Sequence, residues 1–303
     1  MRKKVRANIL LIVTAIIWGF GFVAQSTAME FIRPFTMTSV RYIIAFIVLI
    51  PVVLFFRKKN SADIPAEPDE RKRYNKTTLI GGVLCGLALA AATSAQQFGV
   101  SMTSVGKAGF ITALYIIIIP ILGVFIRKKI RWIVWVCAGI AIVGFYLLCI
   151  NESFSISSGD LLCLLCALLF SIQMILVDHF LAKSVDCILM SCVQFLTAGV
   201  AAGIFMFIFE TPTWTALWDA RISILYAGVC SGGIAYTLQI VGQKDTSPTV
   251  ASLILSLESV FSVIGGWLIL GERLSLKELI GCLLVFAAVI LAQIPPPEKK
   301  NAD

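Results

Sequence analysis

The chain contains repeated runs of apolar residues, each about as long as a helix that crosses a lipid bilayer. A transmembrane helix needs roughly 20 consecutive apolar residues, whereas a membrane β-barrel strand is short and alternates between apolar and polar residues. The uninterrupted apolar run at Ile43–Phe56 excludes that alternation. Hydrophobic residues make up 59% of the chain and charged residues 14%, against about 45–50% and 25% in soluble domains. The sequence therefore predicts an all-α polytopic membrane protein.

Ten membrane-spanning helices are expected. The first run follows a basic segment and resembles a signal peptide, but it is longer than a typical apolar region of that kind, so we expect a retained helix. Pro120 should kink the fourth span, because proline removes a backbone donor. The expected spans lie at about 8–27, 35–56, 77–98, 105–126, 132–150, 159–180, 187–209, 221–241, 246–273 and 276–294.

The formal charge of +8 is concentrated between the spans. Lys and Arg gather on the cytoplasmic side of membrane proteins. Placing both termini in the cytoplasm puts the basic clusters before residue 8, at 57–76 and at 127–131 on that side. The segment 57–76 is expected to be a solvated cytoplasmic loop. The charge thus indicates a multi-pass protein of the cytoplasmic membrane, in contact with lipid and not with nucleic acid.

The two halves of the chain resemble each other. A shift of 143 residues aligns Gln96 with Gln239, Tyr115 with Glu258 and Lys129 with Glu272. A shift near 153 aligns Arg41 with Gln194 in the earlier helices of each half. The predicted domains are repeats at 1–150 (helices 1–5, with the loop 57–76) and 151–303 (helices 6–10). Five spans is an odd number, so the second repeat would be inverted, as in many secondary transporters.

Two charged residues lie inside predicted spans. A carboxylate at the bilayer centre costs roughly 2.5–3.5 kcal/mol on insertion scales, so Glu258 should face a cavity or a partner. Three roles are open to Glu258. It could couple transport to protons, because burial disfavours its charged form. It could instead pair with a tyrosine hydroxyl, or it could only satisfy polar groups of neighbouring helices. Arg41 either binds an anion or a structural partner, or extends its charged end to the nearby interface.

A central cavity is expected between helices 1, 3 and 4 of the first half and 6, 8 and 9 of the second. Aromatic faces would hold an apolar body, while amides and hydroxyls would orient a polar end. Gln96 and Gln239 have the alternative role of hydrogen bonds between helices. The predicted substrate-binding residues are Trp18, Gln96, Tyr115, Tyr236, Gln239, Ser256 and Glu258.

Several motifs together resemble the ten-helix EamA-type branch of the drug/metabolite transporter superfamily. They are Ala15–Phe20 (AIIWGF), Arg41-Tyr42 with Ala45, Thr103–Pro120, Leu257–Phe261 (LESVF) and Leu270–Arg273 (LGER). Ser259 stands where the family often has proline, and Lys128-Lys129 replaces the Gly-Glu pair in the first half. The resemblance implies secondary active transport of small organic metabolites or drugs, amino acids among them, in many members as export. Alternating access to the cavity would move the substrate.

Other classes of function find less support in the sequence. An enzyme is not expected, because a single His excludes an HExxH metal site and no catalytic grouping is evident; no metal or cofactor is expected either. A membrane scaffold or receptor without transport is the alternative, and it predicts no repeat-symmetric polar cavity. Cys163 and Cys166 have CxxC spacing within an apolar helix and favour a packing role. Asp178-His179 is expected to be an interfacial polar pair more than a proton relay.

Overall fold

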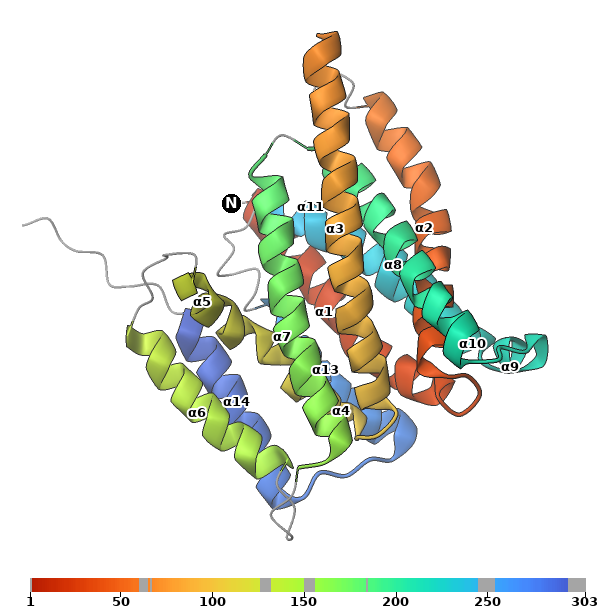
Figure 1. Ribbon diagram of the computed structural model, residues 1–303. Coiled ribbons are helices and arrows are strands. Elements are labelled where there is room, and N and C mark those ends of the chain that lie inside the picture. Colours follow the sequence, from red (N-terminus) through yellow and green to blue (C-terminus); the bar gives the residue numbers. More distant parts are fainter. Residues whose placement is uncertain are drawn as a thin grey trace, which may run out of the picture.

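The computed structural model describes residues 2–59, 65, 67–125, 132–149, 156–183, 185–244 and 254–293 (Figure 1). Every regular element in these ranges is a helix, which confirms the all-α prediction. Within the same ranges, seven helices are long and apolar enough to cross a membrane. They are Val5–Ala28, Pro34–Phe55, Pro68–Val100, Val105–Gly123, Ser158–Leu181, Cys187–Phe209 and Arg221–Gln239. Shorter apolar helices lie at Trp135–Leu147 and Glu258–Leu270.

The described residues form helices of very different lengths. In chain order they are α1 (Arg2–Ala28), α2 (Pro34–Lys59), α3 (Pro68–Val100), α4 (Val105–Ala113), α5 (Tyr115–Phe125), α6 (Trp132–Cys149), α7 (Ser158–Leu181), α8 (Cys187–Phe209), α9 (Trp214–Asp219), α10 (Arg221–Leu225), the π-helix η2 (Tyr226–Ala235), α11 (Tyr236–Lys244), α13 (Glu258–Gly265), the π-helix η3 (Gly266–Leu270) and α14 (Leu276–Gln293).

Helix α3 begins earlier than the sequence suggested. Residues 68–76 were expected in a loop, but they form its first turns and extend beyond the other helices in Figure 1. Pro68 at the first helical position and Asp69 and Glu70 in the first turn explain this start. Proline there loses no hydrogen bond, and acidic side chains interact favourably with the positive end of the helix dipole. Part of the expected solvated loop is therefore helical.

The expected fourth span is interrupted at Leu114, between α4 and α5, and not at Pro120, which lies inside α5. The amide of Leu114 bonds to the carbonyl of Ile111 (3.2 Å), three residues back, so the turn is tighter there. The amide of Leu257 bonds to the carbonyl of Ile254 at the same distance. These two breaks are 143 residues apart. Tyr115 and Glu258 each begin a new helix at equivalent positions of the two halves.

Equivalent helices of the two halves pack against each other. Helix α2 contacts α8, and α6 contacts α14, the last two running side by side in Figure 1. Helix α4 also contacts α13, which is the counterpart of α5. Helix α7 lies on α3, just as its counterpart α1 lies on η2 and α11. Helices that meet their own counterparts, as α2 and α6 do, are typical of two units related by a two-fold axis.

Small residues allow the close approach of these helices, as in other membrane bundles. A Cβ on Gly86 would lie 2.7 Å from the carbonyl oxygen of Gln194. A Cβ on Gly228 would lie 3.0 Å from the carbonyl oxygen of Arg41, the counterpart of Gln194. These two glycines are 142 residues apart, whereas Gln96 and Gln239 are 143 apart. The second half has one additional residue between them, and η2 accommodates it, because each π-helical turn holds more residues than an α-helical turn.

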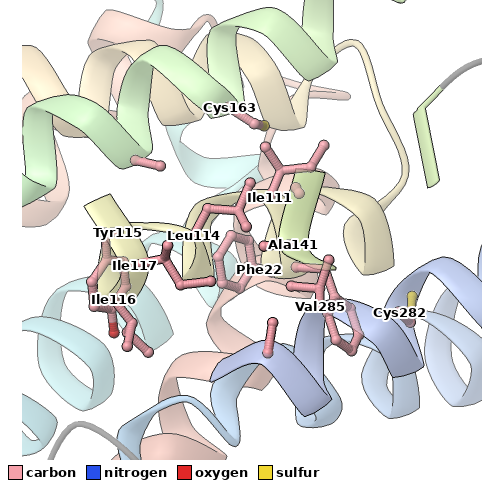
Figure 2. Close-up of a cluster of buried hydrophobic side chains, with 14 of the residues drawn as sticks. Phe22, Ile111, Leu114, Tyr115, Ile116, Ile117, Ala141, Cys163, Cys282 and Val285 are labelled. Atoms are coloured by element: carbon pink, nitrogen blue, oxygen red, sulfur yellow. The ribbon is translucent and has the colours of Figure 1, made fainter. Parts of the chain in front are cut away.

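The largest apolar cluster lies where α4 and α5 meet α6, α7 and α14 (Figure 2). Cys163 and Cys282 are buried in it among aliphatic side chains, as expected for cysteines that only pack. Large apolar side chains also cover the outside of the bundle. Phe207 is 76% exposed and Ile142 is 69% exposed. Such a surface suits contact with acyl chains, while the helices satisfy their own backbone groups.

A glycine-to-alanine pair tests the close contact between α1 and α13. A Cβ on Gly19 would lie 2.8 Å from the carbonyl oxygen of Glu258 and 2.9 Å from the carbonyl carbon of Phe261. Because both atoms belong to the backbone, Gly19→Ala should destabilise the protein by about 1–3 kcal/mol. Gly139, with no atom within 4 Å of its would-be Cβ, is the matched control. Thermal unfolding in detergent should show a lower midpoint for Gly19→Ala alone; equal midpoints would contradict the packing.

Candidate substrate site

A polar cavity lies in the middle of the bundle and is lined from both halves of the chain. Its volume is about 100 Å³, whereas a single buried water needs roughly 10–15 Å³ on the same measure. It therefore has room for a small organic group. The lining residues are Trp18, Phe22, Gln25, Arg41, Tyr42, Thr93, Gln96, Thr112, Tyr115, Phe170, Gln173, Met174, Ala227, Ser231, Gly232, Tyr236, Gln239, Leu255 and Glu258.

The structure brings together every predicted wall residue except Ser256. Trp18, Gln96, Tyr115, Tyr236, Gln239 and Glu258 all line the cavity, and Arg41 joins them from α2, a helix that was not expected to contribute. Ser256 is fully buried in the turn before Glu258, where its carbonyl oxygen accepts from the hydroxyl of Ser259 (2.8 Å). The interruption at 256–257 places Ser256 outside the cavity lining.

Further polar lining residues follow from helical spacing around the predicted ones. Thr93 precedes Gln96 by three residues, Thr112 precedes Tyr115 by three, and Gln25 follows Trp18 by seven. Residues at these spacings share a helix face. Gln173 on α7 lies in the expected sixth span, and its amide nitrogen donates to Gln194 Oε1 (3.3 Å). Periodicity could thus have identified the first three.

At the centre of the site, the hydroxyl of Tyr115 donates to Glu258 Oε1 at 3.3 Å. Both residues are buried, at 7% and 6% exposure. Each begins a helix after a break, so the Glu258 carboxyl lies at the positive end of the α13 dipole. The two partners are also counterparts under the 143-residue shift. A residue that contacts its own counterpart lies on the axis that relates the two units.

Arg41 is the cation of the cavity. Its side chain is only 5% exposed and stacks over the Tyr42 ring, with the guanidinium carbon 4.8 Å from the ring centre. Its Nη2 donates weakly to the Tyr42 hydroxyl (3.4 Å), and its Nε has no partner in the described part of the chain. Among the described residues, no carboxylate lies within ion-pair distance of it. The guanidinium thus borders the cavity instead of extending to an interface.

Aromatic contacts hold one wall of the cavity in place. The indole N–H of Trp18 donates to the carbonyl of Ser231 in η2 (3.2 Å). The Trp18 ring also meets Tyr236 edge-on, with centroids 4.9 Å apart, and Tyr236 meets Phe195 in the same way at 5.1 Å. Edge-to-face pairs of this kind are favourable beyond the area that they bury. The wall therefore presents preordered aromatic faces.

Several polar groups at the cavity make no hydrogen bond to the described part of the chain. Gln25 Oε1 and Thr112 Oγ1 are buried without a partner there. Gln96 and Gln239 place their amide groups at the same cavity. Buried polar atoms are nearly always hydrogen-bonded to protein or water. Gln25 Oε1 and Thr112 Oγ1 are therefore placed to bond to a molecule in the cavity.

The other candidate residues lie outside the cavity. Asp178 and His179 are both exposed at the end of α7, where His179 packs on the ring of Phe180. Cys163 and Cys166 are buried and free. Among the described residues, no group of three His, Cys, Asp or Glu side chains could hold a metal ion. The chemistry of the cavity therefore belongs to Arg41, Glu258 and the uncharged polar groups around them.

A bundle of apolar helices around a polar cavity is the architecture of a multi-pass membrane transporter. Comparison with known proteins gives the family. The EamA-like transporter family matches residues 5–150 and again 157–293, so the chain belongs to that family. Transport, and not enzymatic catalysis, is what defines the family.

Relatives along the whole length carry the same description. An uncharacterized transporter of Archaeoglobus fulgidus is 28% identical over 96% of this chain and 87% of its own. The uncharacterized transporter YoaV of Bacillus subtilis is 24% identical over 95% of this chain and 96% of its own. A protein crystal structure shares the fold, with a TM-score of 0.66 and 16% identity over 94% of this chain and 96% of its own.

Proposed function

We propose that this protein is a secondary active transporter that exports small organic metabolites or drugs across the cytoplasmic membrane by alternating access. The observation that carries the proposal is the hydrogen bond between Tyr115 and Glu258 inside a polar cavity lined by both halves. A site on the axis between two repeats can open to either side with equivalent motions of the two halves. A scaffold or receptor without transport predicts no polar cavity that is symmetric between the repeats.

Ten spans arranged as two inverted repeats fit this proposal. The paired breaks at Leu114 and Leu257, and the packing of α2 and α6 on their own counterparts, support a two-fold relation between the halves. The distribution of basic residues supports placing both termini in the cytoplasm. The shorter segments α6, α13 with η3, and α14 would complete the ten spans together with the seven long helices.

The substrate class follows from the two ionisable groups in the cavity, Arg41 and Glu258. Arg41 offers a planar donor group with a free Nε, and planar guanidinium groups suit carboxylates. Glu258 offers a carboxyl group, and the two are not paired with each other. Trp18, Phe22 and Phe170 supply aromatic faces. The best match is a small molecule with both an anionic and a cationic group on an apolar body, such as an amino acid.

Glu258 is the proposed coupling residue. It is the buried carboxyl group of the cavity, and its partner Tyr115 can donate a hydrogen bond to the charged form. Moving the cavity from one side to the other would expose this carboxyl to water of different pH. Proton binding on one side and release on the other would then link the substrate movement to the proton gradient.

A counterflow assay in proteoliposomes tests the proposal. Proteoliposomes containing the purified protein would be loaded with unlabelled compounds from one of three pools: amino acids, organic cations or organic anions. Uptake of the same compounds in labelled form would then be followed. Transient accumulation of a zwitterionic compound, absent from protein-free liposomes, is the expected result. Accumulation confined to other pools would contradict the substrate class, and no counterflow with any pool would favour the scaffold or receptor.

A further inference from the structure

One end of the helix bundle is held together by carboxylates that reach from the second half of the chain to the first. Glu210, which follows α8, accepts hydrogen bonds from the amides of Phe35 (2.9 Å) and Thr36 (2.7 Å) and from the Thr36 hydroxyl (2.6 Å). It is only 7% exposed. These amides belong to the first turn of α2, where backbone donors have no partner within the helix. Glu210 therefore supplies the cap that α2 lacks.

Glu272 reaches the start of α4 in a similar way, beside the helix's own cap, in which Ser104 Oγ accepts from the amide of Lys107 (3.4 Å). Its Oε1 accepts from the amide of Val105 (2.9 Å) and its Oε2 from the amide of Gly106 (3.3 Å). Both contacts cross between the halves, over more than 160 residues of sequence. A carboxylate at a helix N-terminus benefits from the hydrogen bonds and from the helix dipole. We call Glu210 and Glu272, with the helix starts that they cap, the carboxylate latches.

Other contacts tie the halves together at the same end. Lys107 Nζ lies 2.7 Å from Glu278 Oε1, and the hydroxyl of Thr103 donates to Asp160 Oδ1 at 2.6 Å. The ends of α1, α3 and α4 that meet here are tightly packed, since Ala28, Val100 and Val105 are at most 2% exposed. This end of the repeat interface is thus closed.

The opposite end cannot form the same latches. The 153-residue shift that aligns Arg41 with Gln194 places Arg57 at the position of Glu210, and the 143-residue shift places Lys129 at the position of Glu272. A cation is repelled by the positive end of a helix dipole. The amide of Leu189, the counterpart of Thr36, is capped instead by Asp186 of its own loop (3.0 Å). At that end the cap comes from the same half as the helix that it caps. The halves meet there instead through the amide of Asp186, which donates to Thr78 Oγ1 of α3 (3.1 Å).

We infer that the carboxylate latches set the resting state of the transporter, by closing the end at which they lie and leaving the cavity to open toward the other end. The inference rests on the proposed alternating access, and the proposed topology places the latches on the outer face. Opening the outer face must break both latches, whereas opening the inner face breaks neither. The cavity is thereby held ready to receive substrate from the cytoplasm.

Thiol accessibility from each side tests this inference without any transport assay. Met174, which lines the cavity, is replaced by cysteine in a background in which the nine native cysteines are substituted. A membrane-impermeant thiol reagent is applied to intact cells for the outer face and to inverted vesicles for the inner face. Glu210→Ala, Glu272→Ala and the double variant are compared with Glu30→Ala, an exposed carboxylate in the α1–α2 loop at the same end.

Removal of one helix cap shifts an equilibrium by roughly 2- to 30-fold. Labelling from the outer face should rise by such a factor in each single variant and further in the double variant, while labelling from the inner face falls. The Glu→Gln variants, which keep one acceptor oxygen, should show the same change to a smaller extent, and Glu30→Ala should match the parent.

Two outcomes would overturn the inference. Lower thermal stability with unchanged labelling from both faces would show that the carboxylates only stabilise helix ends. Whether the protein transports its substrate would then still be decided by the counterflow assay. A rise from both faces together would show a leak and not a shift between two states. Because labelling needs no substrate, it can show that the latch inference is wrong without deciding whether the protein transports a substrate, which counterflow tests.

Discussion

Replacing Arg41 with glutamine is expected to weaken substrate binding more than any other single change in the cavity. The guanidinium is buried, has no acidic partner among the described residues, and presents its free Nε beside the cavity. Losing a buried, charged hydrogen-bond partner costs about 2–5 kcal/mol. The apparent affinity for a zwitterionic substrate should therefore fall by at least about 30-fold, at tenfold for each 1.4 kcal/mol. Counterflow at a series of substrate concentrations measures this change.

The choice of ligand separates binding from a general defect. Arg41→Gln should lose affinity for an amino acid but not for the corresponding amine, which has no carboxylate to meet the guanidinium. Arg41→Lys is the matched control, because it keeps the charge and loses the planar fork, so an intermediate loss is expected. Equal losses for the amino acid and its amine, or none for either, would show that Arg41 does not bind the substrate's anionic group.

Glu258→Gln is expected to abolish concentrative transport while leaving exchange in place. The amide keeps a hydrogen-bond acceptor for Tyr115 but cannot bind and release a proton in the working pH range. Counterflow, which moves substrate in both directions without net proton movement, should continue. Accumulation driven by an imposed pH gradient should disappear. Proteoliposomes with and without the gradient provide the two measurements on one preparation.

Tyr115→Phe is the control for this prediction. It removes the hydrogen bond to Glu258 but leaves the carboxyl group, so gradient-driven transport should persist, with a shifted dependence on pH. If Glu258→Gln still accumulates substrate against its gradient as the parent does, the carboxyl group has only a structural role.

Much of the bundle could be predicted from apolar runs, because a bilayer fixes the length of a helix that crosses it. Helix boundaries that depend on local capping could not. The start of α3 at Pro68 lies in a polar, charged stretch, where a hydropathy pattern gives no sign of a helix. The break at Leu114 is also invisible to composition, because an apolar run continues through it.

The site was predictable to the extent that internal similarity identifies polar residues in apolar surroundings. The alignment of Tyr115 with Glu258 placed both near mid-membrane, and the structure brings them into contact. Ser256 was placed on the wall because an uninterrupted helix was assumed, whereas the turn at 256–257 removes it from the lining. The free atoms of Gln25 and Thr112 depend on side-chain positions, and no pattern in the sequence reports which buried atoms lack partners.

Thiol labelling at position 115, with and without substrate, tests most directly whether Tyr115 and Glu258 face a shared aqueous passage. The Tyr115→Cys variant, without other cysteines, would be treated with a membrane-impermeant reagent in proteoliposomes, and Glu258→Cys treated in the same way. Both thiols should react and both should be protected by the substrate found in counterflow. Reaction only with a lipid-soluble reagent, unchanged by substrate, would show that these side chains face acyl chains and would contradict the account.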